Sequence, residues 1–374
     1  MRISVPKETR PGENRVALVP DIISKLTRAG LEVVIESGAG LTAQFSDEQF
    51  TKAGATVKSG NVISDSDIVA SIQPLTPDQM KSLKKGAITI SFLSPTTAVD
   101  SIEAAASAGA TALSLELVPR ISRAQSMDAL TSQALCAGYR ATLVAAELSP
   151  RFFPLLMTAA GTVTPANVVI LGAGVAGLQA IATAKRLGAV VSAYDVRPAS
   201  ADEVKSMGAK FITLELEALE GQGGYAREMT EDRAAKQREL LTPYIAAADV
   251  LITTAAVPGR PAPRLVTAEM VATMSPGSVV VDLASETGGN VEGTLPGEII
   301  ITSNGVKMWG GKDVPSQLPF HASMLFSRNV VNLLMLMVKT TDGVATVIPD
   351  FSDEIIDAAA VTHGGARRTP EGKK

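Results

Sequence analysis

The chain has 374 residues, of which 46% are hydrophobic and 19% charged, and its formal net charge is −4. This length and apolar content exclude a disordered chain and suffice for two globular domains. The slightly negative net charge does not indicate nucleic-acid binding, and we expect none. A single cysteine, Cys136, excludes an intrachain disulfide framework. With only His321 and His363 and no paired ligand spacing, no metal site is expected.

The N-terminal residues read as a strand and lack the apolar core of a signal peptide. The longest late apolar stretch, Val330–Val338, is interrupted by Asn332 and is far shorter than the roughly 20 residues that span a bilayer. We therefore expect a soluble cytoplasmic protein with no direct membrane insertion.

Residues 1 to about 128 alternate short strands and helices, which is typical of an α/β domain with a mostly parallel sheet. Asp21 is expected to cap the first helix. In chain order the expected strands are Ile3–Val5, Leu31–Ile35, Ile68–Ile72, Ala87–Phe92 and Ala112–Leu117, and the expected helices are Asp21–Ala29, Asp47–Ala53 and Val99–Ala108.

Asp128–Leu148 is one long helical pattern that suits a connector between domains. Glycine-rich, charged Glu217–Arg233 is expected to be a mobile surface loop running into a helix. Ser323–Val338 predicts a long apolar helix, and the tail from His363 is expected to be frayed. The strands expected after the connector are Val168–Leu171, Val190–Tyr194, Lys210–Thr213, Val250–Thr253, Ser278–Asp282, Ile299–Thr302 and Lys307–Trp309.

The most informative stretch follows the strand Val168–Leu171. Gly172, Gly174 and Gly177 form G-x-G-x-x-G between that strand and a helix-forming run. The first glycine permits a tight turn, the second lets a pyrophosphate approach the backbone, and the third lets the helix pack near the strand. The helix N-terminus adds free N–H groups that face the phosphate charge. The combination of strand, turn and helix predicts a dinucleotide site.

Asp195 ends the next strand, 18 residues after Gly177. A carboxylate there can accept hydrogen bonds from the ribose hydroxyls of adenosine, and it repels a 2′-phosphate, which favours NAD(H) over NADP(H). Arg197 weakens the second inference, because a nearby arginine can bind a 2′-phosphate.

Other polar stretches also follow strands, where open α/β sheets bind ligands. The first fifteen residues hold a charged cluster that predicts a binding edge or a solvated turn equally well. Segments 253–263 and 282–290 could line the nucleotide or be ordinary strand exits. In the loop before the connector, Arg120, Gln125 and Asp128 could supply the paired donors and acceptors that a carboxamide requires. Asp128 could instead be only the N-cap of the connector helix.

Together these motifs resemble one family. The opening, Val5-Pro-Lys-Glu with Pro11-Gly-Glu-Asn-Arg15, resembles the shared start of the alanine dehydrogenases and of the NAD(H)-binding component of proton-translocating nicotinamide nucleotide transhydrogenase. Three later stretches resemble the transhydrogenase specifically, namely Arg120–Asp128, Thr158–Gly188 and Gly223-Gly-Tyr-Ala226. The resemblance covers nearly all of the chain.

Departures from the alanine dehydrogenase pattern favour the transhydrogenase. Gln73 stands where those enzymes carry a substrate-binding lysine, and Ser91-Phe-Leu lacks their catalytic histidine. Oxidising an amino acid needs a proton acceptor and a carboxylate clamp. Hydride exchange between two nicotinamides needs only close positioning of the rings. An alanine-dehydrogenase-like amino-acid oxidoreductase and a non-catalytic NAD(H)-sensing module remain as alternatives.

The resemblance implies two doubly wound Rossmann-like α/β domains with parallel sheets, joined by long helices, with a nucleotide cleft between them. Residues 1–128 with 320–374 are expected to form the N-terminal domain, and 129–319 the NAD(H)-binding domain. The implied reaction is reversible hydride transfer between NAD(H) here and NADP(H) on a partner subunit, coupled to proton translocation by a membrane-spanning subunit. A homodimer at the cytoplasmic face of the inner membrane, held there through its partner subunits, is also implied.

The same resemblance assigns residues to the nucleotide. Gln125 is expected to bridge to the second nucleotide, with Arg120 and Asp128 beside it at the reacting end. Tyr225 is expected to close over the nucleotide on the mobile loop. The loop next to the nicotinamide and its ribose would contain Arg120, Ile121, Ser122, Arg123, Gln125, Asp128 and Thr131, and the rest of NAD(H) would be lined by Val175, Asp195, Val196, Arg197, Gly224, Gln237 and Ala256.

Overall fold

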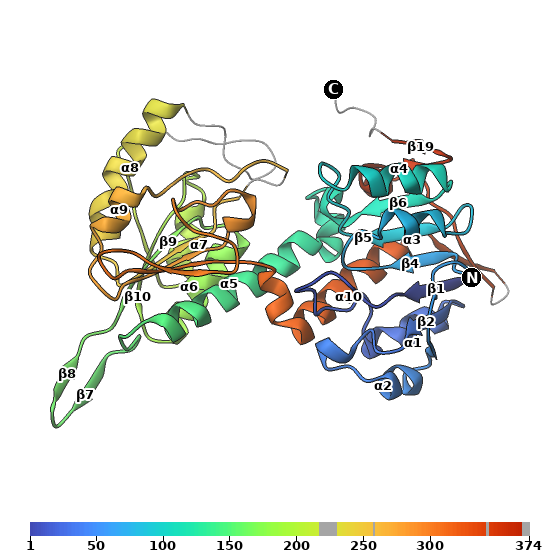
Figure 1. Ribbon diagram of the computed structural model, residues 1–374, viewed down its shortest axis with the longest axis horizontal. Helices are drawn as coiled ribbons and strands as arrows, with labels where there is room; N and C mark the ends of the chain where they lie inside the picture. Colours follow the sequence, from blue (N-terminus) through green and yellow to red (C-terminus); the bar gives the residue numbers. More distant parts are fainter. Residues whose placement is uncertain (217–229, 257–258, 342–343, 369–374) are drawn as a thin grey trace. The chain divides into compact units, whose positions relative to one another are not determined.

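The computed structural model describes residues 1–216, 230–256, 259–341 and 344–368 (Figure 1). The chain divides into two compact units, of which unit 1 comprises Met1–Gln133 with Pro315–Lys374 and unit 2 comprises Ala134–Val314. Each boundary lies five residues from the one expected from the sequence.

Unit 1 is built on a parallel sheet. Over the described residues this sheet has six strands in the order β3-β2-β1-β4-β5-β6. The chain adds β2 and β3 on one side of β1 and then returns to place β4 on the other, so the topological switch point lies between β1 and β4. The bounds are β1 Arg2–Val5, β2 Glu32–Glu36, β3 Thr56–Lys58, β4 Ile68–Ala70, β5 Ile88–Ser91 and β6 Thr111–Ser114.

Several helices of unit 1 begin at residues that mark a helix N-terminus in the sequence. Ser46 and Thr76 form capping boxes at the starts of α2 and α3. The expectation that Asp21 caps α1 is wrong, because Pro20 takes the first helical position and Val19 precedes it, so Asp21 lies inside the first turn. The bounds are α1 Pro20–Arg28, α2 Asp47–Lys52, α3 Pro77–Lys81, α4 Val99–Ser107, α10 Pro319–Met335 and α11 Glu354–Ala359.

Two further expectations in unit 1 are corrected by hydrogen-bonding geometry. The expected strand Ala112–Leu117 ends early, because Leu115–Leu117 turns into a 3₁₀ helix. The expected helix Ser323–Val338 begins at Pro319 and ends at Met335, and Val338–Thr341 (β16) instead pairs antiparallel with Val344–Val347 (β17).

Residues 363–368 are not frayed. Thr362–His363 (β18) and Ala366–Arg367 (β19) form a hairpin, because Gly364 and Gly365 both adopt the positive φ that such a two-residue turn requires. The hairpin is fixed to β6, where the backbone N–H of Val361 donates to the carbonyl oxygen of Ala112. Residues 369–374 lie outside the described residues.

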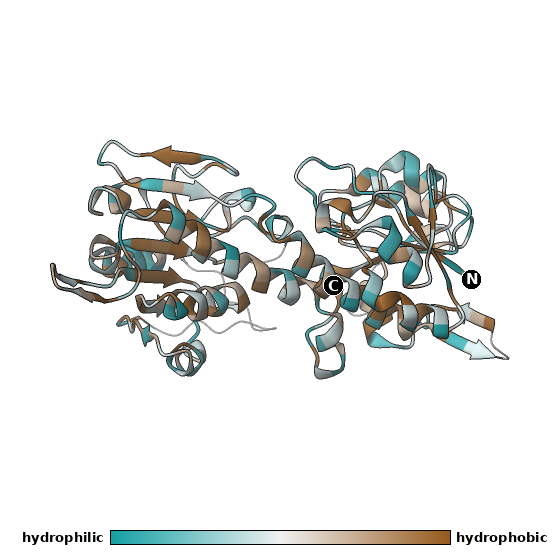
Figure 2. Cartoon of the chain, turned by 90° about the horizontal axis from the view of Figure 1, so that it is seen from below, coloured by the Kyte–Doolittle hydropathy of each residue, from teal (hydrophilic) through white to brown (hydrophobic). Residues whose placement is uncertain are grey.

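Unit 2 has the second sheet. Over its described residues the strand order is β11-β10-β9-β12-β13-β15-β14, with seven strands that pair in parallel except for the antiparallel edge strand β14. The switch point lies between β9 and β12. Several of its strands are brown in Figure 2 because their residues are strongly apolar. The bounds are β9 Asn167–Leu171, β10 Val190–Tyr194, β11 Lys210–Phe211, β12 Val250–Thr253, β13 Val279–Asp282, β14 Ile299–Ile301 and β15 Lys307–Gly310.

Helices cover both faces of this second sheet, which explains the unbroken apolar runs of its strands. Val168 and Ile170 pack in one core, and Val169 and Leu171 pack in the other. The helices are α5 Ala129–Leu148, α6 Val175–Arg186, α7 Ser200–Ser206, α8 Glu231–Ala246 and α9 Ala268–Ala272, and a hairpin of β7 Leu156–Thr158 and β8 Gly161–Val163 follows α5. Among the described residues, no helix combines the length and apolarity needed to cross a bilayer.

Candidate nucleotide-binding site

The turn from β9 into α6 has the geometry that its three glycines predict. Gly172 has φ of 101°, and a Cβ there would lie 2.6 Å from Oγ1 of Thr254. A Cβ on Gly177 would lie 1.9 Å from the carbonyl oxygen of Gly172, so only glycine lets α6 pack this close to β9. Gly174 differs, because no heavy atom lies within 4 Å of the position of its Cβ. Open space at the N-terminus of a helix, where N–H groups lack intrahelical partners, is what a pyrophosphate needs.

Asp195 lies beside this turn at the end of β10. Its Oδ2 accepts a hydrogen bond from the backbone N–H of Ala173 at 2.7 Å. The backbone N–H of Arg197 donates to Oδ1, and the Arg197 guanidinium donates to both carboxylate oxygens, all at 2.9 Å. Burial favours the neutral acid, but the hydrogen bonds and charge of Arg197 outweigh it and hold the pKa of Asp195 below its ordinary value. Asp195 is therefore a charged carboxylate fixed to the turn.

This arrangement weakens the preference for NAD(H) over NADP(H) that the sequence predicts. Four donors already occupy the carboxylate of Asp195, so a ribose hydroxyl has to compete with the Arg197 guanidinium. The ion pair carries no net charge, so its repulsion of a 2′-phosphate is weaker than that of an isolated carboxylate. Arg197 lies on the Asp195 carboxylate, so binding of a 2′-phosphate by Arg197 remains open.

Gln237 is buried on α8, 1% exposed, and its Oε1 accepts a hydrogen bond from the Tyr194 hydroxyl at 3.0 Å. Burial raises the pKa of Tyr194 to about 12, so the hydroxyl remains a donor at neutral pH. The contact ties α8 to the last residue of β10, directly before Asp195. Gln237 thereby supports the site, a role that its sequence context does not reveal.

Two buried polar side chains hold the strand exits beside the turn. Asn290 accepts the N–H of Ala255 at 3.0 Å and donates to the carbonyl oxygens of Ala255 and Pro263 at 2.8 Å. Asp282 accepts hydrogen bonds from the hydroxyls of Thr253 and Thr294 and from the backbone N–H groups of Ala284 and Val291. Asp282 and Asn290, at the two ends of segment 282–290, therefore brace these strand exits. At the exit of β12, the hydroxyl of Thr254 donates to the carbonyl oxygen of Gly172 at 3.1 Å, and Ala256, two residues later, is exposed.

In unit 1, two of the predicted residues of the loop before α5, Asp128 and Thr131, contact each other. Asp128 accepts the backbone N–H of Thr131 at 2.8 Å and its hydroxyl at 2.6 Å, so Asp128 caps α5, the alternative that the sequence left open. Nδ2 atoms of Asn329 and Asn332 donate to the carbonyl oxygen of Ser126 and fix the loop to α10. The loop is therefore a well-anchored segment.

The other predicted residues of this loop differ in their surroundings. The Arg123 guanidinium binds Asp353 at 2.7 and 2.8 Å and holds the pKa of that carboxyl below its ordinary value. Gln125 is exposed, and its carboxamide makes no hydrogen bond with the described residues. Arg120 and Ser122 are exposed, and Ile121 packs against the core.

Two of the residues assigned by resemblance, Gly224 and Tyr225, lie outside the described residues, as does most of the loop expected at 217–233. The helix expected to follow that loop is α8, which begins at Glu231. Within the four described ranges, no group of side chains is arranged to hold a metal ion.

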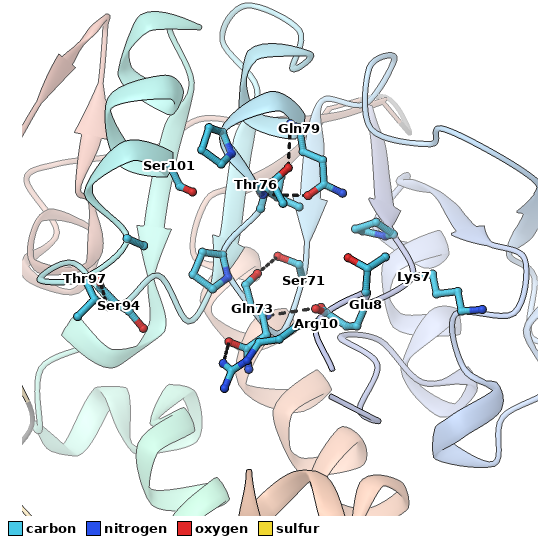
Figure 3. A pocket seen from close by; sticks show the side chains of 16 residues that line it. Lys7, Glu8, Arg10, Ser71, Gln73, Thr76, Gln79, Ser94, Thr97 and Ser101 are labelled. Atoms are coloured by element: carbon cyan, nitrogen blue, oxygen red, sulfur yellow. Dashed lines mark hydrogen bonds between the residues drawn. The ribbon is translucent and has the colours of Figure 1, made fainter. Parts of the chain in front are cut away.

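A cavity of about 440 Å³ lies at the switch point of the first sheet (Figure 3). Oε1 of Glu8 accepts the N–H of Ile72 at 2.6 Å, and burial raises the pKa of Glu8 to about 7. Arg10 donates to Oε1 of Gln73 at 2.8 Å, and Nε2 of Gln73 donates to Glu13 at 2.7 Å. Polar side chains of the N-terminal segment thus line the cavity at this edge of the sheet.

Behind this cavity lies a buried ion pair. The Arg15 guanidinium donates to Oε1 and Oε2 of Glu13 at 2.7 and 2.6 Å and to Gln133 at 2.8 Å. Burial alone would raise the pKa of Glu13, but the hydrogen bonds and charge of Arg15 hold it below its ordinary value. The N-terminal charged cluster therefore includes a buried network and is not simply a solvated turn.

Comparison with known proteins gives matches over most of the chain. Residues 4–137 match the sequence profile described as "Alanine dehydrogenase/PNT, N-terminal domain", and residues 141–370 match its C-terminal counterpart. The chain is 47% identical over 376 residues to an NAD(P) transhydrogenase alpha-subunit protein of Rhodospirillum rubrum, covering 98% of this chain and 97% of that protein. An alanine dehydrogenase of Mycobacterium tuberculosis is 32% identical over 79% of this chain and 76% of its own length. The crystal structure of a transhydrogenase from Sinorhizobium meliloti has a TM-score of 0.86 and 42% identity, with 99% of each chain covered.

Proposed function

Because the chain belongs to the alanine dehydrogenase/PNT family, we propose that it is the NAD(H)-binding subunit of a proton-translocating NAD(P) transhydrogenase. Hydride passes reversibly between NAD(H) on this chain and NADP(H) on a partner subunit, and a membrane-spanning subunit couples the transfer to proton translocation. The chain acts as a homodimer, associated with the membrane through these partners. The similarity to a transhydrogenase alpha subunit over 98% of the chain supports this assignment.

The observation that carries the proposal is the β9–α6 turn. Space at Gly174 and the free N–H groups of the first turn of α6 suit the pyrophosphate, and the Asp195–Arg197 pair is placed for the adenosine ribose. The rest of the nucleotide site is lined or supported by Val175, Val196, Gln237 and Ala256. Gly224 and Tyr225 complete the set of residues assigned by resemblance. NAD(H) supplies the hydride chemistry when bound, and the chain's own residues only bind and orient it.

At the nicotinamide end, we assign the work to the loop Arg120–Thr131. The exposed Gln125 carboxamide has both a donor and an acceptor to offer a nicotinamide or a second nucleotide. The carboxylate of Asp128 accepts two hydrogen bonds from Thr131, so we assign it the role of orienting the loop. Arg120, Ile121, Ser122 and Arg123 shape the same segment. Hydride transfer between two nicotinamides requires this positioning and no general base.

The amino-acid dehydrogenase alternative lacks support in unit 1. The guanidinium of Arg15 is committed to Glu13 and Gln133, so it offers no open clamp for a substrate carboxylate. Gln73 is likewise engaged with Arg10 and Glu13. No lysine takes part in this network among the described residues.

The proposal is tested by calorimetric titration of the purified chain with NADH and NADPH. We expect NADH to bind more tightly, Asp195→Asn to weaken NADH about tenfold, which is about 1.4 kcal/mol, and Arg197→Ala to weaken NADPH further. Arg197→Lys is the matched control, because it keeps the charge without the guanidinium fork. Equal or tighter binding of NADPH by the wild type would overturn the NAD(H) assignment.

A second assay separates the classes of function. An NADP(H)-binding partner subunit is added to the NADH-loaded chain, and hydride transfer is followed by absorbance with an analogue of NADP⁺ whose reduced form is spectrally distinct. Turnover supports the transhydrogenase. Binding without transfer indicates a sensing module, and turnover of L-alanine with NAD⁺ indicates an amino-acid dehydrogenase.

A further inference from the structure

The helix that presents the phosphate-binding N-terminus is held from a second side by a residue outside the glycine fingerprint. Gly138 is buried in the middle of α5. A Cβ on Gly138 would lie 2.0 Å from the carbonyl oxygen of Ala176, 2.8 Å from its carbonyl carbon and 3.0 Å from its Cα. Ala176 is the second residue of α6, so the contact falls on the first turn of that helix.

Thr142 continues the contact one turn further along α5. Its side chain is fully buried, and Oγ1 lies 3.2 Å from the carbonyl oxygens of both Gly138 and Ala180. Residues four apart share one face of a helix, so Gly138 with Thr142 on α5 faces Ala176 with Ala180 on α6. Small residues on both faces let the two backbones approach closely.

Nothing local in α5 calls for glycine at this position. Gly138 lies inside a regular helix and has no positive φ, and alanine is favoured over glycine in helix interiors. The glycine therefore costs α5 stability. The approach of the Ala176 carbonyl is the feature of the structure that accounts for it.

We propose that Gly138 is a positioning residue for nucleotide binding, because its contact with Ala176 sets the position of the first turn of α6. This inference rests on the proposed function. Gly172 and Gly177 let α6 pack closely on β9, and Gly138 lets α5 approach the first turn of α6. A side chain at position 138 has to push the first turn aside, which moves the N–H groups at Gly174 and Val175 away from the pyrophosphate. Hydrogen bonds to an anion tolerate only a few tenths of an ångström of such movement.

The experiment compares Gly138→Ala with Ala137→Gly, a neighbouring change that alters helix propensity in the opposite direction and adds no atom. Dissociation constants are measured for NADH, for ADP-ribose and for adenosine, which lacks a pyrophosphate. We expect Gly138→Ala to weaken NADH and ADP-ribose at least tenfold and adenosine less than twofold, with Ala137→Gly within twofold of wild type for all three.

The outcomes separate the inference from the function on which it rests. Wild-type protein that fails to bind NADH overturns the proposed function itself. If Gly138→Ala binds NADH as tightly as wild type does, only the positioning role is overturned. The same holds if its affinities for all three ligands fall equally, because that indicates a general loss of structure.

Thr142 provides a second route if Gly138→Ala does not fold. Thr142→Val removes the hydroxyl that links α5 to Ala180 while keeping the side-chain shape. We expect a three- to fivefold loss of NADH affinity that Thr142→Ser restores. Unchanged NADH binding in Thr142→Val would contradict the proposed contact.

Discussion

Both units arrange their strands in the same winding order, with β1-β4 at the switch point of unit 1 and β9-β12 at that of unit 2. They differ in the turn that follows the first strand. In unit 2, α6 begins at Val175, four residues after β9 ends at Leu171. In unit 1, α1 begins at Pro20, fifteen residues after β1 ends at Val5.

The longer connection of unit 1 lines the cavity at its switch point with side chains. Glu8 and Arg10 lie at the cavity, and the Glu13–Arg15 pair is buried behind it. In unit 2 the corresponding space is bounded by backbone and left open at Gly174. The shared topology fixes where a ligand can bind, and the length and glycine content of one turn decide whether a phosphate can reach backbone N–H groups there.

The largest expected effect on nucleotide binding comes from destroying the turn of unit 2. In Gly177→Ala, the new Cβ would lie 1.9 Å from the carbonyl oxygen of Gly172, so α6 has to move off β9. We expect NADH affinity to fall at least 100-fold, which is about 3 kcal/mol, together with a lower melting temperature. Gly174→Ala is the matched variant, because its Cβ meets open space.

In Gly174→Ala we expect unfolding in urea to resemble that of the wild type, while NADH binds about tenfold more weakly because the methyl group occupies the phosphate space. Titration calorimetry and urea unfolding measure the two effects separately. Tight NADH binding by Gly177→Ala would show that this turn is not the binding site.

The largest expected effect on stability concerns the buried Glu13–Arg15 pair of unit 1. Glu13→Ala leaves the Arg15 guanidinium buried without its carboxylate, and breaking a buried pair in this way costs about 3–5 kcal/mol. Urea unfolding measures the loss. Lys52→Ala removes one partner of the exposed Glu48–Lys52 pair and is the control, with no measurable change expected. Equal stability of Glu13→Ala and wild type would mean that the Glu13–Arg15 ion pair is solvated and does not stabilise the fold.

The sequence predicts the strands of both sheets well because burial on two faces leaves continuous apolar runs such as Val168–Leu171. Short or exposed elements contain too few residues to show a hydrophobic pattern, so the sequence does not predict β3 or the β7–β8 hairpin. The helix α3 was missed as well, although Thr76-Pro-Asp-Gln79 is a readable capping box. The C-terminal hairpin also had a signal, the adjacent glycines Gly364 and Gly365.

From the sequence, the site can be predicted only where it depends on residues that lie close together in the chain. The glycine turn and the position of Asp195 follow from spacing along one βαβ unit. The bonding of Asp195 to Arg197 depends on side-chain conformation, and the brace from Asn290 to Ala255 joins residues 35 apart in sequence. The contact of Gly138 with Ala176 likewise requires the packing of two helices. The last two contacts join residues far apart in the chain, so no repeating pattern in the sequence indicates them.

The last predicted effect concerns the pH dependence of stability, which tests how well the side chains at the switch point of unit 1 are shielded from water. Burial raises the pKa of Glu8 from its ordinary value of 4.5 to about 7. Between these values the folded chain binds a proton at Glu8 that the unfolded chain does not, so the stabilisation from Glu8 is complete below about pH 4.5 and is lost as pH rises through 7. Glu8→Gln keeps the acceptor for the Ile72 N–H but cannot ionise.

We therefore expect the free energy of unfolding of wild type to fall by about 2 kcal/mol relative to Glu8→Gln between pH 5 and pH 8. Urea unfolding at four pH values in this range measures the difference, and Glu48→Gln on the exposed face controls for the change in net charge. Taking the difference between wild type and Glu8→Gln removes the contribution of Glu13, whose lowered pKa acts with the opposite sign and at lower pH. Parallel pH profiles would mean that water reaches Glu8 freely, and the side chains at the switch point of unit 1 would then be a hydrated surface open to ligands, like the turn at Gly174.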